Sequence, residues 1–206
     1  TILAQDDLKL VAAIEPRQLS AQSFILPNLD KLEQDFDVLI DFSHPSNIQP
    51  ILSYCSEHKK PLVICTTGFD DNVLVNIQKA AEFIPLILAS NTSQGVNLMH
   101  QLVRKAVKAL AADFDIEIVE AHHNKKLDAP SGTANSLLET VQDTLSEEYA
   151  VEYGRKGMAK RVNKEIGMHS LRAGTIVGEH TIILAGEDET IEIKHTALSK
   201  KIFAKG

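Results

Sequence analysis

The chain has 206 residues, of which 44% are hydrophobic and 24% are charged, a composition typical of a folded globular protein. The formal net charge of −7 argues against a general nucleic-acid-binding protein. No apolar run approaches the length that would cross a membrane, so a membrane protein is not expected either.

The first part of the chain alternates short apolar runs with helical patterns. Residues 1–5 resemble the end of a helix, and residues 16–35 form a polar connection with a weak helical signal at 29–32. Such alternation is typical of βαβ units, and it predicts a parallel sheet with helices on both faces. The predicted strands are residues 8–14, 38–42, 62–65 and 86–89, and the predicted helices are residues 48–55 and 73–81.

Polar residues follow each of these predicted strands. They are Glu15, Ser43-His44-Pro45, Thr66-Thr67-Gly68 and Ser90-Asn91-Thr92. Parallel sheets of this kind bind ligands beyond the carboxyl ends of their strands. The shared edge therefore predicts a nucleotide crevice, although a single Thr-Thr-Gly would more simply be a plain turn.

The second part of the chain begins with a strong helix at residues 96–112. In it Leu98, Leu102, Ala106 and Leu110 form one line, with Met99, Val103 and Val107 beside them. Residues 147–166 are polar and predict a mobile loop or an edge element. The predicted strands are residues 115–121, 169–172, 175–184 and 190–195, and the short turns between the last three predict antiparallel pairing. A sheet with one helix layer leaves its other face open, which predicts oligomerisation through that face.

The densest group of reactive side chains lies in Glu-Ala-His-His-Asn-Lys-Lys-Leu-Asp-Ala-Pro-Ser-Gly-Thr-Ala, residues 120–134. Ser131 is a suitable N-cap for a helix whose apolar stripe is Ala134, Leu137, Leu138, Val141 and Leu145. Unpaired N–H groups at this helix start, with His123 and Lys126 nearby, could hold a carboxylate or phosphate. The simpler alternatives are an ordinary helix cap, solvated histidines and solvated lysines.

This stretch resembles the signature of the dihydrodipicolinate reductase family. Further similar stretches are residues 41–45 (Asp-Phe-Ser-His-Pro), 66–69 (Thr-Thr-Gly-Phe), 90–97 (Ser-Asn-Thr-Ser-Gln-Gly-Val-Asn), 172–174 (Arg-Ala-Gly) and 177–180 (Val-Gly-Glu-His). The resemblance implies an α/β fold with a Rossmann-like dinucleotide-binding domain at residues 1–93. It also implies an α+β substrate-binding and oligomerisation domain at residues 94–206, built on a mixed, largely antiparallel sheet, and a homotetramer.

The resemblance also implies the reaction. A nicotinamide cofactor delivers hydride to cyclic 4-hydroxy-tetrahydrodipicolinate after loss of water, giving tetrahydrodipicolinate in lysine and diaminopimelate biosynthesis. His122 is expected to be the general acid/base, and Lys126 the proton donor and electrostatic partner. The residues expected to bind the substrate carboxylate are His123, Ser131, Gly132 and Thr133.

The expected cofactor is NADH or NADPH. Glu15 is expected to accept hydrogen bonds from the adenosine ribose, whereas Arg17 could contact a 2′-phosphate, so the preference stays open. Cys65 stands where the family often has glycine. The residues expected near the nicotinamide half are Cys65, Thr66, Thr67, Gly68, Ala89, Ser90, Asn91 and Thr92.

The sequence departs from the family pattern at its ends. It contains no glycine-rich pyrophosphate turn, and the spacing of Glu15 places that turn before Thr1. The family's chain also continues beyond residue 206. We therefore expect this sequence to be a piece of a longer reductase, with a naturally short form as the alternative.

Two other functions remain open from the sequence. One is a non-catalytic dicarboxylate-binding or regulatory oligomer, which would keep the Ser-Gly-Thr site without cofactor chemistry. The other is a metal-dependent hydrolase using His122, His123 and Asp128, although adjacent histidines rarely chelate one ion. The two cysteines, Cys55 and Cys65, have no disulfide or metal-site spacing and indicate a reducing, cytoplasmic compartment.

Overall fold

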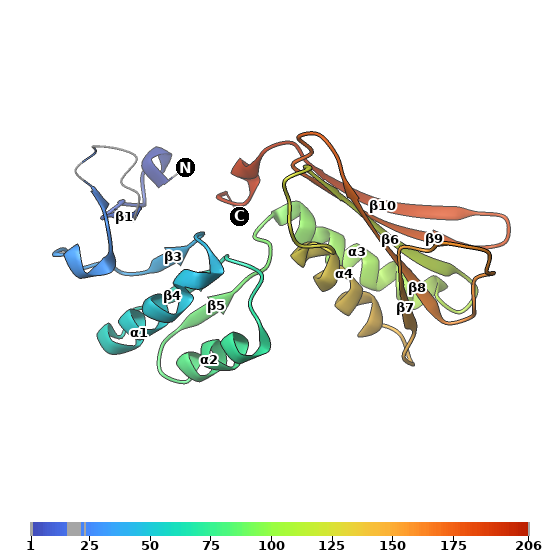
Figure 1. The fold of residues 1–206 in the computed structure, drawn as a ribbon, viewed down its shortest axis with the longest axis horizontal. Helices are drawn as coiled ribbons and strands as arrows, with labels where there is room; N and C mark the ends of the chain where they lie inside the picture. The colour runs from blue at the N-terminus through green and yellow to red at the C-terminus, as the bar shows by residue number, and fades with distance from the viewer. Residues whose placement is uncertain (1, 16–21, 23, 206) are drawn as a thin grey trace. The chain divides into compact units, whose positions relative to one another are not determined.

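The structure is a computed structural model that describes residues 2–15, 22 and 24–205. It divides the chain into two compact units, Thr1–Ala89 and Ser90–Gly206 (Figure 1). The sequence predicted the boundary a little later, between residues 93 and 94. Each unit has its own sheet and its own apolar core.

The first unit contains a three-stranded parallel sheet. Its strands are β3 (Leu39–Asp41), β4 (Leu62–Ile64) and β5 (Leu86–Leu88), in the order β3-β4-β5. Two helices connect them, α1 (Ile48–His58) and α2 (Asp71–Ala81), and a 3-10 turn, η3 (Pro45–Asn47), precedes α1. The predicted parallel βαβ arrangement is confirmed.

Both helices of this unit pack on the same side of the sheet. Residues of α1 and α2 form one buried cluster with Leu62 and Ile64 of β4. On the opposite side, Ile40 and Ile87 are exposed on either side of Val63. Within the described residues, the second helix layer expected from the sequence is not seen on that side.

The N-terminal strand is much shorter than predicted. Of residues 8–14, only β1 (Ala13–Ile14) is a strand, and it pairs in parallel with β2 (Ile25–Leu26). Residues 8–12 have no ladder partner in the described part of the chain, and an apolar run needs such a partner to become a strand. The weak helical signals correspond to two 3-10 turns, η1 (Ile2–Ala4) and η2 (Leu29–Lys31).

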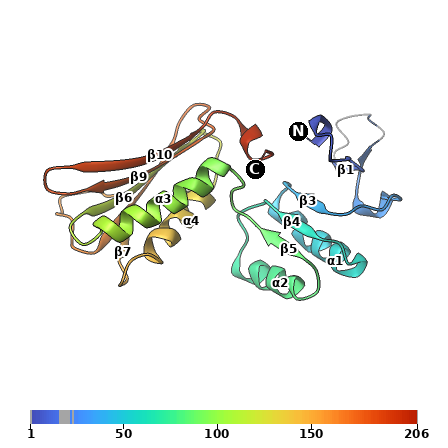
Figure 2. The same cartoon turned by 180° about the vertical axis from the view of Figure 1, so that it is seen from behind.

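The second unit is a five-stranded mixed sheet covered by two helices. Its strands are β6 (Asp115–His122), β7 (Ala150–Tyr153), β8 (Glu165–Arg172), β9 (Gly178–Ala185) and β10 (Thr190–Ala197), in the order β10-β9-β6-β8-β7. The helices are α3 (Gln94–Leu110) and α4 (Gly132–Gln142), and a 3-10 turn, η4 (Lys200–Ile202), follows β10. Figures 1 and 2 show α3 and α4 side by side against one face of this sheet.

One predicted strand pairing is wrong. The short turn predicted at Ala173-Gly174 implied that β8 and β9 pair with each other, but β6 lies between them. β6 pairs in parallel with β8 and antiparallel with β9, while β9 and β10 form the expected antiparallel pair. A turn limits the distance between strand ends, and a third strand still fits in that distance.

The structure shows which of the two apolar rows of α3 is fully buried. Met99, Val103 and Val107 are buried in the core, whereas Leu98 and Leu102 are exposed. Both rows are apolar at helical spacing, so periodicity alone could not tell which of them faces the sheet.

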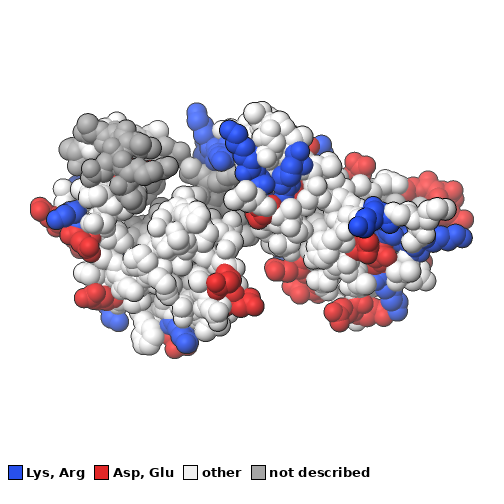
Figure 3. All heavy atoms as spheres, viewed as in Figure 1, with Lys and Arg blue, Asp and Glu red and all other residues white. Residues whose placement is uncertain are grey.

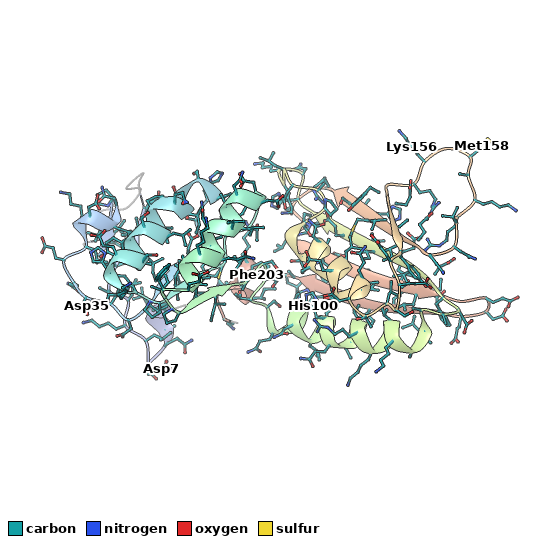
Figure 4. The ribbon with its side chains drawn as sticks, turned by 90° about the horizontal axis from the view of Figure 1, so that it is seen from below. Asp7, Asp35, His100, Lys156, Met158 and Phe203 are labelled. Atoms are coloured by element: carbon teal, nitrogen blue, oxygen red, sulfur yellow. The ribbon has the colours of Figure 1, made fainter. Side chains whose placement is uncertain are left out.

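The polar stretch before β8 forms an edge strand and a loop. β7 pairs in parallel with β8 at the edge of the sheet. This agrees with the edge element, one of the two alternatives predicted for residues 147–166. Arg161, in the loop that follows β7, forms ion pairs with Asp115 and Glu117 of β6 and so holds this loop against the sheet. Figure 4 shows Lys156 and Met158 on the projecting part of this loop, and Met158 is fully exposed.

The sheet of the second unit is open on the face away from α3 and α4. Ile116 and Ile118 face the helices, so the alternate residues of β6, Glu117 and Val119, lie on the other face. Acidic and basic side chains are interspersed over this unit in Figure 3. Among the described residues, no helix is long and apolar enough to cross a membrane.

Candidate active site

The site is built around Glu120, near the end of β6. Glu120 follows Ile116 and Ile118 on the helix-facing side of the strand, and only 1% of it is exposed. A buried carboxylate on a core-facing position is costly unless it is paired. Its partners therefore define which parts of the chain meet here.

Glu120 accepts hydrogen bonds from three segments of the unit. Arg172 of β8 donates from Nη2 to Oε1 (2.7 Å) and from Nη1 to Oε2 (2.9 Å). The backbone N–H of Ser131 donates to Oε1 (3.2 Å), and Nδ1 of His122 lies 2.6 Å from Oε2. Burial alone would raise the pKa of Glu120, but hydrogen bonds from His122, Arg172 and Ser170 outweigh it and lower the pKa well below its ordinary value.

His122 is held by one ring nitrogen and has space at the other. Its Nδ1 is taken by Glu120, and the ring of His180 meets it edge-on with 5.2 Å between ring centroids. A Cβ atom at Gly178 would come within 3.1 Å of Nε2 of His122. Glycine at this position therefore keeps the surroundings of Nε2 open.

The start of α4 is as the sequence predicted. Ser131 is the N-cap, and its Oγ accepts from the N–H of Ala134 (3.2 Å). The same Oγ lies 2.9 Å from Nε2 of His180, in a fully buried contact. Burial, together with the neighbouring His122, lowers the pKa of His180 to about 4, so this imidazole is neutral near pH 7.

Gly132 and Thr133 form the first turn of α4. The hydroxyl of Thr133 accepts from Nδ2 of Asn91 (2.9 Å), and Oδ1 of Asn91 accepts from the N–H of Ser93 (2.8 Å). Thr92 donates to the carbonyl of Phe203. Asn91, predicted to lie near the cofactor, is thus joined directly to the predicted carboxylate site.

Lys126 is held by Asp128. Its Nζ donates to both carboxylate oxygens, at 2.7 and 2.8 Å, and the N–H of Lys126 donates to the carbonyl of His123. Arg172 also donates to the carbonyl of Asp128 (2.7 Å). The loop that carries His123 and Lys126 is therefore tied to the same arginine that pairs with Glu120.

The first unit carries the other predicted cofactor residues. Cys65, Thr66, Thr67 and Gly68 follow β4, and Gly68 has a φ of 87° that favours glycine. Ala89 follows β5, and its N–H donates to the carbonyl of Ile64. Burial, with the nearby Asp41 charge, raises the pKa of the Cys65 thiol. A thiol in this state is not an activated nucleophile.

Two buried polar atoms at this edge fit a polar ligand. Oδ2 of Asp41 and Oγ1 of Thr66 are buried and have no hydrogen-bond partner in the described part of the chain. Such atoms are normally satisfied, so they suit the hydroxyl or amide groups of a nicotinamide nucleotide. Glu15 donates its N–H to the carbonyl of Leu26, and Arg17 lies outside the described residues.

Three residues of the site lay within the family-like stretches but were given no role from the sequence: Glu120, Arg172 and His180. Strand alternation could have found Glu120, because it shares the parity of Ile116 and Ile118 and so had to be buried. Arg172 and His180 come from strands whose neighbours were not predictable, and no local pattern connects them to residue 120. Within the described residues, no group of three or more His, Cys, Asp or Glu could hold a metal ion.

Comparison with known proteins identifies the family. The models for the N-terminus and the C-terminus of dihydrodipicolinate reductase match residues 1–92 and 95–206. The chain belongs to the dihydrodipicolinate reductase family. Its fold class, and the class of NAD(P)H-dependent reductase, are as the sequence predicted.

Curated proteins similar to this chain support the same family assignment. The 4-hydroxy-tetrahydrodipicolinate reductase of Clostridium tetani is 44% identical over 202 residues, which are 98% of this chain and 79% of that protein. The one from Brachyspira hyodysenteriae is 48% identical over 170 residues, 82% of this chain and 73% of that protein. The dipicolinate-bound dihydrodipicolinate reductase of Paenisporosarcina sp. TG-14 has the same fold, with a TM-score of 0.71 and 22% identity, covering 99% of this chain and 83% of that one.

Proposed function

We propose that this chain reduces 4-hydroxy-tetrahydrodipicolinate to tetrahydrodipicolinate in lysine and diaminopimelate biosynthesis. The net reaction consumes the substrate, NADH or NADPH and one proton, and it releases tetrahydrodipicolinate, the oxidised cofactor and water. The observation that carries the proposal is the single network that joins His122, Glu120 and the start of α4, within the family's signature sequence. A bound nicotinamide cofactor supplies the hydride.

The second unit binds the dicarboxylate in this proposal. The first N–H groups of α4 and the positive end of its dipole suit one carboxylate, and Ser131, Gly132 and Thr133 supply the contacts. Neutral His180 supports this role, because Ser131 Oγ can accept from both His180 and Ala134 and still donate its own proton to the ligand. His123 adds a contact from the loop.

His122 and Lys126 handle protons. His122 acts as general acid/base through Nε2, the ring nitrogen that Glu120 leaves available. Lys126 is the proton donor and electrostatic partner, and Asp128 holds its ammonium group in place until substrate arrives. An ammonium that tightens its contact as negative charge develops lowers the barrier of the chemical step more than it strengthens binding.

Cofactor binding is assigned mainly to the first unit. Two alternatives stay open for the adenosine end: Glu15 accepts from the ribose hydroxyls, which favours NADH, or Arg17 instead contacts the 2′-phosphate of NADPH. Comparison of the rates with NADH and NADPH decides between them. The polar atoms of Asp41 and Thr66 support a nicotinamide-side role for the edge after β4. The other residues proposed for the nicotinamide half are Cys65, Thr67 and Gly68 after β4 and Ala89, Ser90, Asn91 and Thr92 after β5.

The roles of the two domains, the oligomeric state and the cellular location belong to the same proposal. Residues 1–93 serve the cofactor, and residues 94–206 serve the substrate and self-association. The chain forms a homotetramer through the open face of its second sheet, which is supported by the absence of a covering layer there among the described residues. A cytoplasmic location is supported by two unpaired cysteines, Cys55 and Cys65.

The first prediction tests the catalytic pair. K126A should lower kcat by about 100-fold while KM changes by less than about fivefold, because the lysine acts mainly in the transition state. H122N should lower kcat by a similar factor. Steady-state oxidation of NADH and NADPH with freshly made substrate measures both variants.

The matched control is K125A, which removes the neighbouring exposed lysine and should retain wild-type kcat. If wild-type protein binds dicarboxylate but oxidises neither cofactor, the non-catalytic binding protein replaces the proposal. If added chelator abolishes turnover, the metal-dependent alternative using His122, His123 and Asp128 returns.

A further inference from the structure

We propose that Glu120 is a positioning residue that fixes the tautomer of His122. It keeps the proton on Nδ1, so that the neutral imidazole presents its lone pair at Nε2 on the open side. This inference rests on the proposed acid/base role of His122. It concerns a buried residue that has no contact with the substrate in that proposal.

The geometry defines which nitrogen carries the proton. Oε2 of Glu120 lies 2.6 Å from Nδ1 of His122, and an ionised carboxylate can only accept a hydrogen bond. Nδ1 must therefore be the donor. The lone pair of the neutral ring is then at Nε2, where Gly178 leaves room.

The carboxylate of Glu120 stays ionised because N–H donors surround both of its oxygens. Both oxygens accept from Arg172, and Oε1 also accepts from the N–H of Ser131. These hydrogen bonds favour the ionised form and support the lowered pKa of Glu120. A protonated Glu120 would place a donor against one of these N–H groups.

The charged and titratable groups around His122 come from three strands and one loop. Glu120 and His122 belong to β6, Arg172 to β8 and His180 to β9, while Lys126 and Asp128 lie in the following loop. Among the described residues, Glu120 is the carboxylate that pairs with the His122 ring. We therefore expect Glu120 to determine the tautomer of His122.

A glutamine at position 120 should reverse the tautomer. Its NH2 group must occupy one of the two oxygen positions. At the Oε1 position it would oppose two N–H donors, from Arg172 and Ser131, whereas at the Oε2 position it opposes one, Nη1 of Arg172. The hydroxyl of Ser170, which also bonds to this carboxylate, can rotate and accept instead. The amide therefore turns its NH2 toward His122, which then accepts at Nδ1 and carries its proton on Nε2.

The decisive measurement is 15N NMR of protein with labelled histidines, at a pH where the rings are neutral. The His122 signals are assigned by their loss in H122N. Wild type should show the Nδ1–H tautomer, and E120Q should show Nε2–H with kcat lowered by about 100-fold and KM nearly unchanged.

The control is E117Q, three residues earlier on the same strand. Glu117 also pairs with an arginine and a histidine, Arg161 and His169, so E117Q loses an equivalent network without touching His122. It should keep the wild-type His122 tautomer and kcat even where thermal stability falls. E120D keeps the charge and should recover part of the lost kcat.

Two results would overturn the inference: an Nε2–H tautomer in wild type, or an E120Q variant with wild-type tautomer and kcat. If E120Q does not fold, as judged by circular dichroism, the wild-type spectrum alone decides the matter. Full activity in H122N would instead remove the proposed catalytic role of His122. The tautomer result would stand in that case.

Discussion

His180 is the residue whose ionisation should be most visible in the stability of the protein. It is buried against Ser131, and burial lowers its pKa from 6.5 to about 4. Between these values the unfolded chain binds a proton that the folded protein does not. Because the unfolded state holds more protons there, the free energy of unfolding decreases as the pH falls from about 6.5 to about 4.

We predict that this one residue contributes a slope of up to about 1.4 kcal/mol per pH unit, or about 3 kcal/mol in total. Urea unfolding of wild type and H180Q at several pH values between 7 and 4 measures it. Glu120, with its lowered pKa, adds acid sensitivity to both proteins, so the difference between them reports His180. A wild-type-minus-variant difference that stays constant over this range would contradict the prediction.

Individual residues of the site were predictable where a local rule applies. Ser131 could be identified as an N-cap because a hydroxyl before an apolar helical stripe has a specific local partner, and the structure shows that partner. Glu120, Arg172 and His180 come from three strands, and only their order in the sheet brings them together. Residues of the site that are close in sequence were therefore predictable, whereas contacts between residues on different strands were not.

At the scale of elements, α3 offers a direct test of which apolar row supports the core. Val103 is fully buried between the sheet and α4, whereas its neighbour Leu102 is 44% exposed. V103A removes two methyl groups and leaves a cavity, so it should lower the free energy of unfolding by about 2 kcal/mol. L102A should cost less than about 0.5 kcal/mol, since it removes surface that water already reaches.

Denaturant unfolding of the two variants gives the comparison directly. Both substitutions leave alanine in the same helix, so helix propensity changes little between them. A larger loss in L102A than in V103A would mean that the row of Leu98 and Leu102 faces a core in solution.

Most elements of the fold were predictable, but their neighbours were less so. Periodicity identified both helices of each unit, and short apolar or alternating runs identified β3 to β6 and β8 to β10. The region of β7 was predicted only as a mobile loop or an edge element. The insertion of β6 between β8 and β9 was not predictable, because it depends on side chains distant in sequence meeting in one core. The strand predicted at residues 8–12 was wrong for the same reason. The apolar pattern is present, but a strand also needs a neighbouring strand to pair with.

At the scale of the whole molecule, the second unit presents one sheet face without a covering layer among the described residues. Val119 lies near the middle of this face, between His169 of β8 and Thr181 of β9. On the same face, Ile183 has Glu117 and Glu192 as its cross-strand neighbours. Such a mixed polar and apolar surface tolerates water in a single chain and can also pack against an identical copy.

The proposed homotetramer therefore makes a specific prediction for V119E. The substitution adds a carboxylate to the central strand, and symmetric packing would bring several such carboxylates close together, where like charges repel. Sedimentation velocity should show a tetramer for wild type and dimers or monomers for V119E, with a circular dichroism spectrum like that of wild type. The control is V75E, the same change at an exposed valine of α2 in the first unit, which should remain tetrameric. A tetrameric V119E would show that the open face is not the contact, and dissociation of V75E would move the contact to the first unit.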